Sequence, residues 1–597
     1  MYAMNRRAES ILAAAAVLIC LGRAIASAQP ASTAPVDLVL VNGNVLTVDP
    51  EFSIAQAVAV SDGRFVRVGR NEEVLSLVGQ QTRVVDLKGQ TLVPGFIDTH
   101  PHTFGRAGRS LRSPSLVGLR SVSAIAEAVA QEVSRTPPGQ WIVTTPIGEP
   151  PDYFHLPESL EEKRWPTRAD LDAVAPENPV YIPIGIWPYP VIFNGVALKR
   201  IGITASEPPD GNGVRIERDP SSGEPTGLVE GMTFYNRSPL WEKLQAMLPR
   251  PSPEMRREAL RQAVYENAAA GVTTIFESHA AQPAHLEHYR ALRASGDLPG
   301  RVVMSYSVNN LQSVDEIDKW MSELPQASGR GSGDDVIKTL GVTIALDGAT
   351  QFGAAHMNEP YLDVYGEPTT GSMPMGQEKL SAIALLAARH NLRLQFTFAG
   401  DAAAEMILLA IEEAEANEHT SIVDRRWLMQ HFQHPTKDHV LRTQQLGLHV
   451  TGYTAVDYSK GAVVYVDRFG GDDRWKSVIP TRWWFDAGVN IAQSTDGAHY
   501  EAPFTLWESL VRIDGRTGES LMSPAKQISR EEALRMYTLN GARVLFWEDQ
   551  LGSIEPGKLA DLVVLDRDIL TCPVDEIKDA KVMLTIVGGE VVYEASP

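Results

Sequence analysis

Between residues 94 and 547, short apolar runs alternate with longer helix-like segments. This alternation predicts a mainly parallel sheet, because two parallel strands must be joined by a long crossover that is usually a helix. We expect strands at 96–99, 180–184, 272–276, 302–306, 342–346, 392–398, 427–430, 449–451 and 489–493. The expected helices include 253–270, 379–390, 402–416 and 530–545, the last opened by a capping box of Ser529 and Glu532.

The predicted fold is therefore α/β, and specifically a (β/α)8 TIM barrel. Such a barrel places its active site at the C-terminal ends of its strands. A doubly wound open sheet is the alternative. No glycine-rich dinucleotide or phosphate-loop pattern follows any expected strand, and this absence disfavours the open sheet.

Both ends of the chain are rich in strand patterns. Residues 57–68 predict a hairpin around Asp62-Gly63, and 560–565 and 582–593 are β-rich near the C-terminus. We expect residues 29–93 and 548–597 to build one composite β-sandwich beside a barrel formed by 94–547. Two separate terminal caps are the alternative.

The strand–helix rhythm fails between about residues 110 and 250, where proline and tryptophan are frequent. So long an irregular stretch predicts an insertion in the barrel with a small structure of its own. It would cover the site as a lid or serve only as packing. Trp187 and its aromatic neighbours would suit an apolar or aromatic substrate, although tryptophans also pack cores.

The first 28 residues have the features of an export signal. Arg6 and Arg7 precede an apolar run at 11–21, and Ala26-Ser27-Ala28 is a small-residue cleavage pattern. The run is too short to span a bilayer, and no later segment is predicted to do so. We expect a periplasmic or secreted protein, and the paired arginines permit a twin-arginine route. Only Cys572 would remain after cleavage, which excludes an intrachain disulfide.

The formal charge is −20, from 54 basic and 74 acidic residues. An acidic chain is a poor partner for nucleic acid or an anionic membrane. The expected partner is a small-molecule substrate, and a homo-oligomer is left open.

Candidate chemistry begins in Leu92-Val-Pro-Gly-Phe-Ile-Asp-Thr-His100-Pro-His102. Residues two apart on a strand point to the same side, so His100 and His102 can aim two imidazoles at one point beyond a buried strand. Neutral imidazole suits a borderline cation such as zinc.

Two other expected strands also end in polar side chains. His431 closes 427–430, with His434 three residues on, and Asp496 follows 489–493. Three imidazoles and one carboxylate meeting at one rim would form a divalent metal site. The alternatives are a core or helix-capping histidine at 431 and a helix N-cap at 496.

A family resemblance rests on six segments. These are 92–102, Leu346-Asp-Gly348, Gly400-Asp401, Gln430-His431, Ser494-Thr-Asp496 and Gly552-Ser-Ile-Glu-Pro-Gly-Lys-Leu-Ala-Asp-Leu-Val-Val-Leu565. Together they resemble the amidohydrolase superfamily, and within it the third amidohydrolase family, which includes N-substituted formamide deformylases. The resemblance covers nearly the whole chain after the signal sequence.

The resemblance implies a metal-binding barrel joined to a β-sandwich made from both termini. It implies that His100, His102 and His431 hold the metal. Asp496 would hold metal and also take a proton from the attacking water, with His431 beside it in the catalytic centre. The reaction implied is hydrolysis of an amide or a related carbon–nitrogen bond.

Two positions depart from the family pattern. Thr343 stands where relatives often carry a carbamylated lysine that bridges two metals, and Thr397 stands where they carry a histidine. Lys338 is five residues from Thr343, so on a strand it would face the other side at roughly 16 Å. We therefore expect one ion, with zinc favoured. A replacement ligand and a weak or absent metal are the alternatives. His279 is the best candidate for such a ligand, although a loop position is the favoured interpretation for it.

Several further residues could reach the site. Tyr453, near the seventh strand, could contact substrate or donate a proton, although buried tyrosines also pack cores. Asp152, Tyr153 and His155 lie in the insertion, and His285 and His288 are expected on a solvated helix face.

The leading hypothesis is a metal-dependent hydrolase that cleaves an amide-like, non-peptide carbon–nitrogen bond of a small, aromatic or apolar substrate. One alternative keeps the barrel but makes it a lyase, isomerase or esterase. The other is a binding protein without catalysis, because fold alone does not establish function.

Overall fold

A computed structural model describes residues 36–596, apart from 150–152, 154–156, 185–189, 207–213, 233–237, 325–329, 364–365 and 419–421. The predicted signal peptide, Trp187, Asp152 and His155 lie outside the described residues. Within the described part of the chain, no helix combines the length and apolar character needed to cross a membrane.

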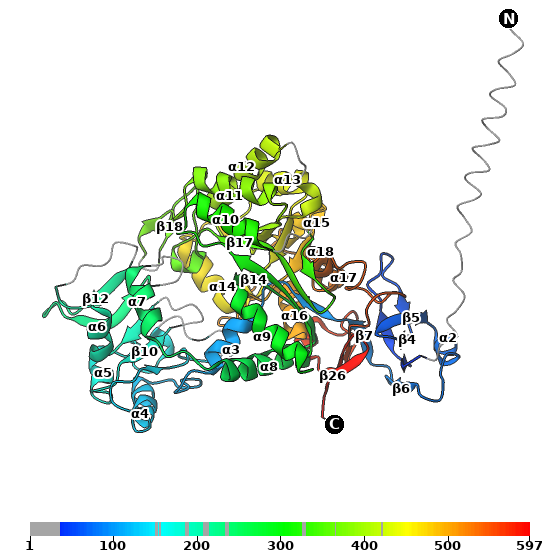
Figure 1. Ribbon diagram of the computed structural model, residues 1–597, viewed down its shortest axis with the longest axis horizontal. Helices are drawn as coiled ribbons and strands as arrows, with labels where there is room; N and C mark the ends of the chain where they lie inside the picture. Colours follow the sequence, from blue (N-terminus) through cyan, green and yellow to red (C-terminus); the bar gives the residue numbers. More distant parts are fainter. Residues whose placement is uncertain are drawn as a thin grey trace, which may run out of the picture.

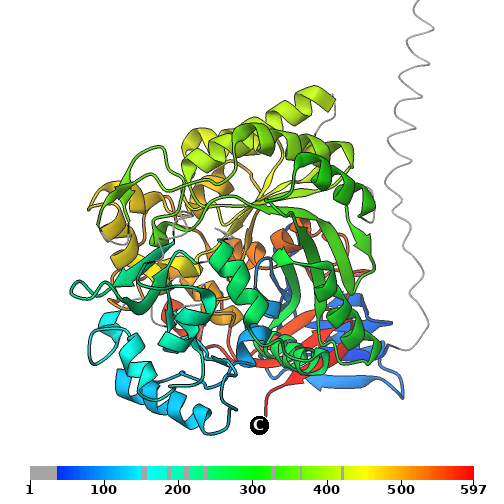
Figure 2. The ribbon, with the colours of Figure 1, turned by 60° about the vertical axis from the view of Figure 1, so that its left-hand side comes forward.

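The centre of the molecule is a sheet of eight parallel strands that are neighbours in the order of the chain (Figures 1 and 2). They are β8 (Phe96–Asp98), β14 (Val272–Ala281), β15 (Arg301–Ser307), β17 (Ile337–Ala345), β20 (Leu394–Thr397), β21 (Leu428–Gln430), β22 (His449–Gly452) and β23 (Ile491–Gln493). The last strand returns to the first, because the backbone N–H and the hydroxyl of Thr99 both donate to the carbonyl of Gln493. The predicted TIM barrel is confirmed, and the open sheet is wrong.

The barrel interior changes character along its strands. At the N-terminal end, one buried cluster joins the apolar side chains Ile97, Phe276, Val303, Leu340, Leu428 and Ala492 to Trp547 below them. Further along the strands, the buried side chains that face one another are polar, as with Ser278, Thr343 and Gln430. The apolar floor excludes water from one end of the barrel and leaves the polar chemistry at the C-terminal end.

The outer helices agree with the sequence prediction in most places. They include α8 (Pro253–Ala269), α11 (Gln377–Arg389) and α12 (Asp401–Glu418). The single helix expected at 530–545 is wrong, because the segment forms α17 (Arg530–Met536) and α18 (Leu539–Val544). The predicted Ser529–Glu532 capping box is present. Thr538 leaves helical geometry, and the chain turns so that Gly541 packs directly on Ile97, where an added Cβ would come within 2.9 Å.

The two ends of the chain build one β-sandwich, as predicted. One sheet has the order β5-β4-β1-β6 and the other β26-β25-β24-β7-β2-β3. Their bounds are β1 (Leu38–Val41), β2 (Asn44–Leu46), β3 (Ile54–Ala55), β4 (Ala57–Ser61), β5 (Arg64–Gly69), β6 (Arg83–Asp86), β7 (Thr91–Pro94), β24 (Leu562–Leu565), β25 (Val582–Val587) and β26 (Glu590–Glu594). Because β7 pairs with β24, the alternative of two separate terminal caps is wrong.

The predicted hairpin between β4 and β5 is confirmed. These strands pair antiparallel, with Asp62 and Gly63 both at positive φ in the connecting turn. Two positive φ values in a two-residue loop match the right-handed twist of the flanking strands.

The insertion forms its own sheet, with the order β12-β13-β11-β10-β9, at the left of Figure 1. The strands are β9 (Ile142–Val143), β10 (Val180–Pro183), β11 (Val191–Phe193), β12 (Arg215–Arg218) and β13 (Pro225–Glu230), flanked by α4 (Val122–Val133), α5 (Arg168–Asp172), α6 (Gly195–Ile201) and α7 (Pro239–Met247). The expected strand at 180–184 therefore belongs to the insertion and not to the barrel. Its apolar run is equally suited to either sheet, and the sequence pattern could not choose between them.

One buried ion pair fastens the barrel to the sandwich. Arg301, at the start of β15, makes a two-pronged contact with Asp561 at 2.7 and 2.8 Å, and both side chains are 3% exposed. Replacing Arg301 with Met should lower the free energy of unfolding by about 3–5 kcal/mol, because the Asp561 carboxylate would be left buried without its partner. Urea unfolding followed by tryptophan fluorescence measures this change.

The matched control is Arg67→Met. Arg67 pairs with Glu73 at 2.7 Å, but its side chain is 51% exposed, so the expected loss is below about 1 kcal/mol. Equal losses for the two variants would contradict a structural role for the buried pair.

Candidate metal centre

Three candidate ligands converge at the C-terminal ends of the first and last barrel strands. The Nε2 atoms of His100 and His102 are 3.0 Å apart. The Oδ1 atom of Asp496 lies 3.0 Å from His102 Nε2 and 3.6 Å from His100 Nε2. His100 and His102 are buried, and the Asp496 side chain is 12% exposed. These three atoms face a common point and could hold one ion.

Asp98 aligns the two strand ends that carry these ligands. Its carboxylate accepts hydrogen bonds from the His100 backbone N–H at 3.0 Å and from the Thr495 backbone N–H at 3.2 Å. The Thr495 hydroxyl donates to it at 2.6 Å. One carboxylate therefore holds the backbone of the ligand His100 and that of Thr495, the neighbour of Asp496. These two segments are far apart in the sequence.

The tautomer of His100 follows from its neighbours. The Ser278 hydroxyl donates to Gln430 Oε1 at 3.1 Å, so it can only accept from His100 Nδ1 at 3.0 Å. The proton of the neutral ring therefore sits on Nδ1, and the Nε2 lone pair faces His102 and Asp496. Orienting a ligand imidazole through its second nitrogen is common in metal sites.

His431 lies beside this cluster, with its ring centroid 5.1 Å from that of His100. Its Nδ1 donates to the Phe398 carbonyl at 3.1 Å, which leaves Nε2 as the available lone pair. Its backbone N–H donates to the Thr451 hydroxyl. The structure thus places all four sequence-predicted ligands in one region, with three of them in direct contact.

The backbone at three of these residues is strained. His102, His431 and Asp496 have φ values of 51°, 37° and 52°, in the left-handed region that side-chain-bearing residues seldom adopt. Such conformations cost of order 1–3 kcal/mol each and cluster at functional sites, where they aim a side chain.

Electrostatics also favour a cation. Burial lowers the pKa of His100 well below its ordinary value, helped by the neighbouring His102, and burial lowers the pKa of His431 as well. Burial alone would raise the pKa of Asp496, but its hydrogen bond to His102 and the attraction of the surrounding imidazoles hold it far below the usual range. Neutral imidazoles around a carboxylate anion fit a borderline divalent ion.

Thr343 and Thr397, the two positions at which the sequence analysis expects a departure from the family pattern, belong to a neutral hydrogen-bond network. The Thr343 hydroxyl donates to the Ser278 carbonyl at 2.5 Å and accepts from Ser305, while the Thr397 hydroxyl donates to Gln430 Oε1 at 3.3 Å. Lys338 points away, since its ammonium donates to the Leu545 carbonyl at the barrel floor. The expectation that Lys338 cannot replace the missing lysine agrees with this placement.

His279 is an inner strand residue, so the alternative that it lies in a loop is wrong. It is buried on β14, with its ring centroid 5.7 Å from those of both His100 and His102. Burial and the neighbouring imidazoles lower its pKa to about 3. The irregular register of β14 between Glu277 and Ala281 extends the strand past the point at which its apolar pattern ends.

The remaining candidate residues, Tyr453, His434 and His285, have different surroundings. Tyr453 follows β22 and shares a buried cluster with Ala498, and its hydroxyl accepts a hydrogen bond from Lys460 at 2.9 Å. His434 faces the Thr350 hydroxyl at 2.6 Å instead of His431. His285 is half-buried and stacks on Phe104 at 3.9 Å, so its expected place on a solvated face is wrong.

Sequence reasoning missed the residues that orient the ligands. Ser278 sets the tautomer of His100, and Asp98 joins the strand ends. Glu277 accepts the Phe104 backbone N–H at 2.8 Å and so caps the helix that His102 opens. Asp98 lies within the 92–102 motif, so the sequence offered a signal for this residue. The other contacts depend on which strands become neighbours.

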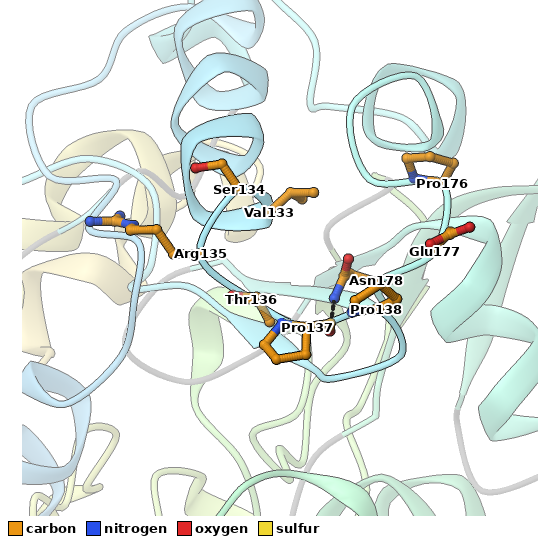
Figure 3. A pocket seen from close by; sticks show the side chains of 9 residues that line it. All are labelled: Val133, Ser134, Arg135, Thr136, Pro137, Pro138, Pro176, Glu177 and Asn178. Atoms are coloured by element: carbon orange, nitrogen blue, oxygen red, sulfur yellow. Dashed lines mark hydrogen bonds between the residues drawn. The ribbon is translucent and has the colours of Figure 1, made fainter.

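A surface cavity of about 450 Å³ lies elsewhere. It is lined by the end of α4 and the 176–178 segment of the insertion, where Asn178 donates to the Pro137 carbonyl (Figure 3). None of the candidate ligands borders it.

Comparison with known proteins places this site in context. A model of the amidohydrolase family matches residues 83–593. The N-substituted formamide deformylase of Arthrobacter pascens is 28% identical, across 94% of this chain and 98% of its own. Protein LONG AFTER FAR-RED 3 of Arabidopsis thaliana is 27% identical, across 95% and 93%.

Solved structures show the same fold. A metal-dependent hydrolase of Pyrococcus furiosus has a TM-score of 0.66 at 21% identity, covering 89% of this chain and all of its own. Atrazine chlorohydrolase of Arthrobacter aurescens, solved with zinc, has a TM-score of 0.52 at 16% identity, covering 93% and 95%.

Proposed function

The chain belongs to the amidohydrolase family, and from this premise we propose that it cleaves an amide-like carbon–nitrogen bond of a small molecule with one divalent ion, zinc being favoured. Membership makes the protein a hydrolase of carbon–nitrogen bonds other than peptide bonds. The contact of His100, His102 and Asp496 is the observation that carries the proposal.

His100, His102, His431 and Asp496 would hold the ion. When bound there, it would lower the pKa of a water toward about 7 and polarise the substrate carbonyl. The donor set supports zinc, because imidazole and carboxylate are common protein ligands of zinc. Catalytic zinc sites also keep a coordination position for water or substrate. Thr343 and Thr397 offer only neutral hydroxyls already used in hydrogen bonds, which supports one ion over two.

Asp496 is proposed as the general base. Its low pKa keeps it ionised at neutral pH, so its carboxylate can accept a proton from the attacking water. It then delivers that proton to the leaving nitrogen, which departs as a neutral amine. For a formamide, the balanced products are the amine and formic acid, and the formic acid then releases its proton to solvent and becomes formate. The hydrogen bond to the Phe398 carbonyl fixes the His431 ring. His431 would then lie beside the carbonyl group of the substrate.

The substrate class proposed is a secondary amide with an apolar or aromatic substituent, beginning with N-substituted formamides. The relative from Arthrobacter pascens supports formamides by its name and its near-complete coverage. Tyr453, buried at the rim of β22, is the proposed substrate contact on the protein side. We propose a periplasmic or secreted location from the sequence of residues 1–28.

A substrate panel tests this function. We expect zinc-loaded protein to hydrolyse N-benzylformamide or a related secondary amide, with formate and amine released in equal amounts. The parallel arms are an ester and a lactone of similar size. Amide turnover at least about tenfold above both arms supports the assignment. Ester or lactone turnover that exceeds amide turnover would overturn it.

A further inference from the structure

The helix that follows the His-x-His pair carries an arginine that forms no ion pair with a carboxylate of the described residues. This helix, α3 (Thr103–Ser110), begins at His102 and lies between the insertion and the barrel helices α8 and α9 (Pro283–Ala294) (Figures 1 and 2). Arg109 is half-buried in this boundary. No described carboxylate forms an ion pair with it, although the chain has twenty more acidic than basic residues.

The neighbouring arginine on the same helix shows what a structural role looks like. Arg106 pairs with Glu266 at 3.2 Å, donates to Asn267 and the Ala263 carbonyl, and lies over the Tyr500 ring. Its guanidinium is fully used in joining α3 to α8. Arg109 instead lies near Tyr153, a residue of the insertion, close enough for the two side chains to interact electrostatically.

The Arg109 side chain folds back toward the candidate metal centre. Residues 102, 105 and 109 lie on one helix face, and 102 and 109 are about 10 Å apart along the helix axis. A Cβ added at Gly105 would lie 3.6 Å from Arg109 Nη1 and 4.0 Å from His102 Cβ. The Arg109 guanidinium and the Cβ atom of His102 therefore both border Gly105.

Neighbouring charges make this place favourable for an anion. Burial, together with the like charges of Arg112 and Arg106, lowers the pKa of Arg109 to about 10. Arg256 of α8 approaches the same helix at Gly108, 3.6 Å from an added Cβ, and its guanidinium lies over the Phe104 ring. A half-buried cation surrounded by cations is stabilised when an anion binds.

We propose that Arg109, with the Tyr153 hydroxyl, binds an anionic group at the far end of the substrate while the scissile bond lies at the His100–His102–Asp496 cluster. The guanidinium offers two parallel N–H donors, which match a carboxylate or a phosphate. This inference rests on the proposed function for the position of the scissile bond. It places an anionic group at the far end of the apolar substituent of the proposed amide substrate, with that apolar spacer passing over Gly105.

Three matched formamides test the proposal in the zinc-loaded full chain. They are N-formyl-6-aminohexanoate, the corresponding N-formylaminopentyl phosphate, and the uncharged N-formyl-6-aminohexanamide. We expect kcat/KM for one of the two anions to exceed that of the amide by about 10- to 100-fold. In Arg109→Gln this preference should fall to about unity, mainly through KM. Arg109→Lys should retain part of it.

The matched control is Arg257→Gln, which removes an arginine of α8 that already pairs with Glu254. It should preserve the anion preference. Tyr153→Phe should weaken the preference by several-fold, because the guanidinium would remain without its hydroxyl partner. An unchanged preference in Arg109→Gln would overturn the proposal.

A binding measurement separates this site from the proposed reaction. Titration calorimetry with adipate and with inorganic phosphate should show binding to the wild type, weakened at least about tenfold in Arg109→Gln. If no formamide is cleaved but this difference appears, the reaction assignment fails and the anion site stands. Equal binding to both proteins, or binding to neither, would overturn the anion site.

Discussion

Replacing Asp496 with Asn should reduce kcat/KM by at least about 10³-fold. The change keeps the size of the side chain and removes the negative charge that faces His102 at 3.0 Å. General-base catalysis contributes about 10²–10⁴-fold, and the loss of a candidate ligand adds to this. Initial rates across a range of pH measure the effect.

The control for this variant is Asp438→Asn, at an exposed position whose side chain is 72% accessible. It should retain full activity. Circular dichroism and thermal unfolding of both variants check that the fold survives. If Asp496→Asn keeps activity within about tenfold of wild type, the carboxylate is not the base.

Removal of the metal should abolish turnover, and zinc should restore it. Dialysis against a strong chelator, followed by elemental analysis, should show that reconstituted protein holds one ion per chain. Bound zinc should also stabilise the fold, by about 4 kcal/mol when free zinc is a thousand times its dissociation constant. A rise in the unfolding midpoint on zinc addition provides a readout independent of catalysis.

Two nearby histidines offer a matched comparison for the metal. His431→Ala should weaken zinc binding, because its Nε2 is available beside His100. His434→Ala should leave zinc binding intact, since its Nε2 already faces Thr350. A stoichiometry near two, or turnover that survives complete chelation, would contradict the one-ion centre.

Local patterns in the sequence were sufficient for the architecture. The alternation of strand-like and helix-like segments predicted the barrel, and the Asp62-Gly63 turn predicted a hairpin of the β-sandwich. The same patterns failed at 180–184 and at 530–545. An apolar run specifies burial but not the sheet in which it is buried. The helical pattern at 530–545 likewise did not show that Thr538 leaves helical geometry between α17 and α18.

The site could be predicted only in part, for a related reason. Strand periodicity placed His100 and His102 together, since residues two apart share a side. The pattern offered His279 only as a candidate beyond the end of a strand, because His279 lies on an irregular extension of β14 past its apolar run. It gave no information about Arg109, whose importance depends on which acidic side chains fold beside α3.

The sequence alone determined which donor atoms stand at which strand ends, because strand periodicity and apolar runs are local properties. Tertiary structure alone decided how these atoms meet. Asp496 and His102 are 394 residues apart in the chain, and only barrel closure brings them to 3.0 Å. The tautomer of His100 depends on Ser278 and Gln430. That Arg109 forms no ion pair within the described part of the chain depends on which side chains fold beside α3. Contacts between distant segments set these features, because hydrogen bonds and charges act over ångströms in space.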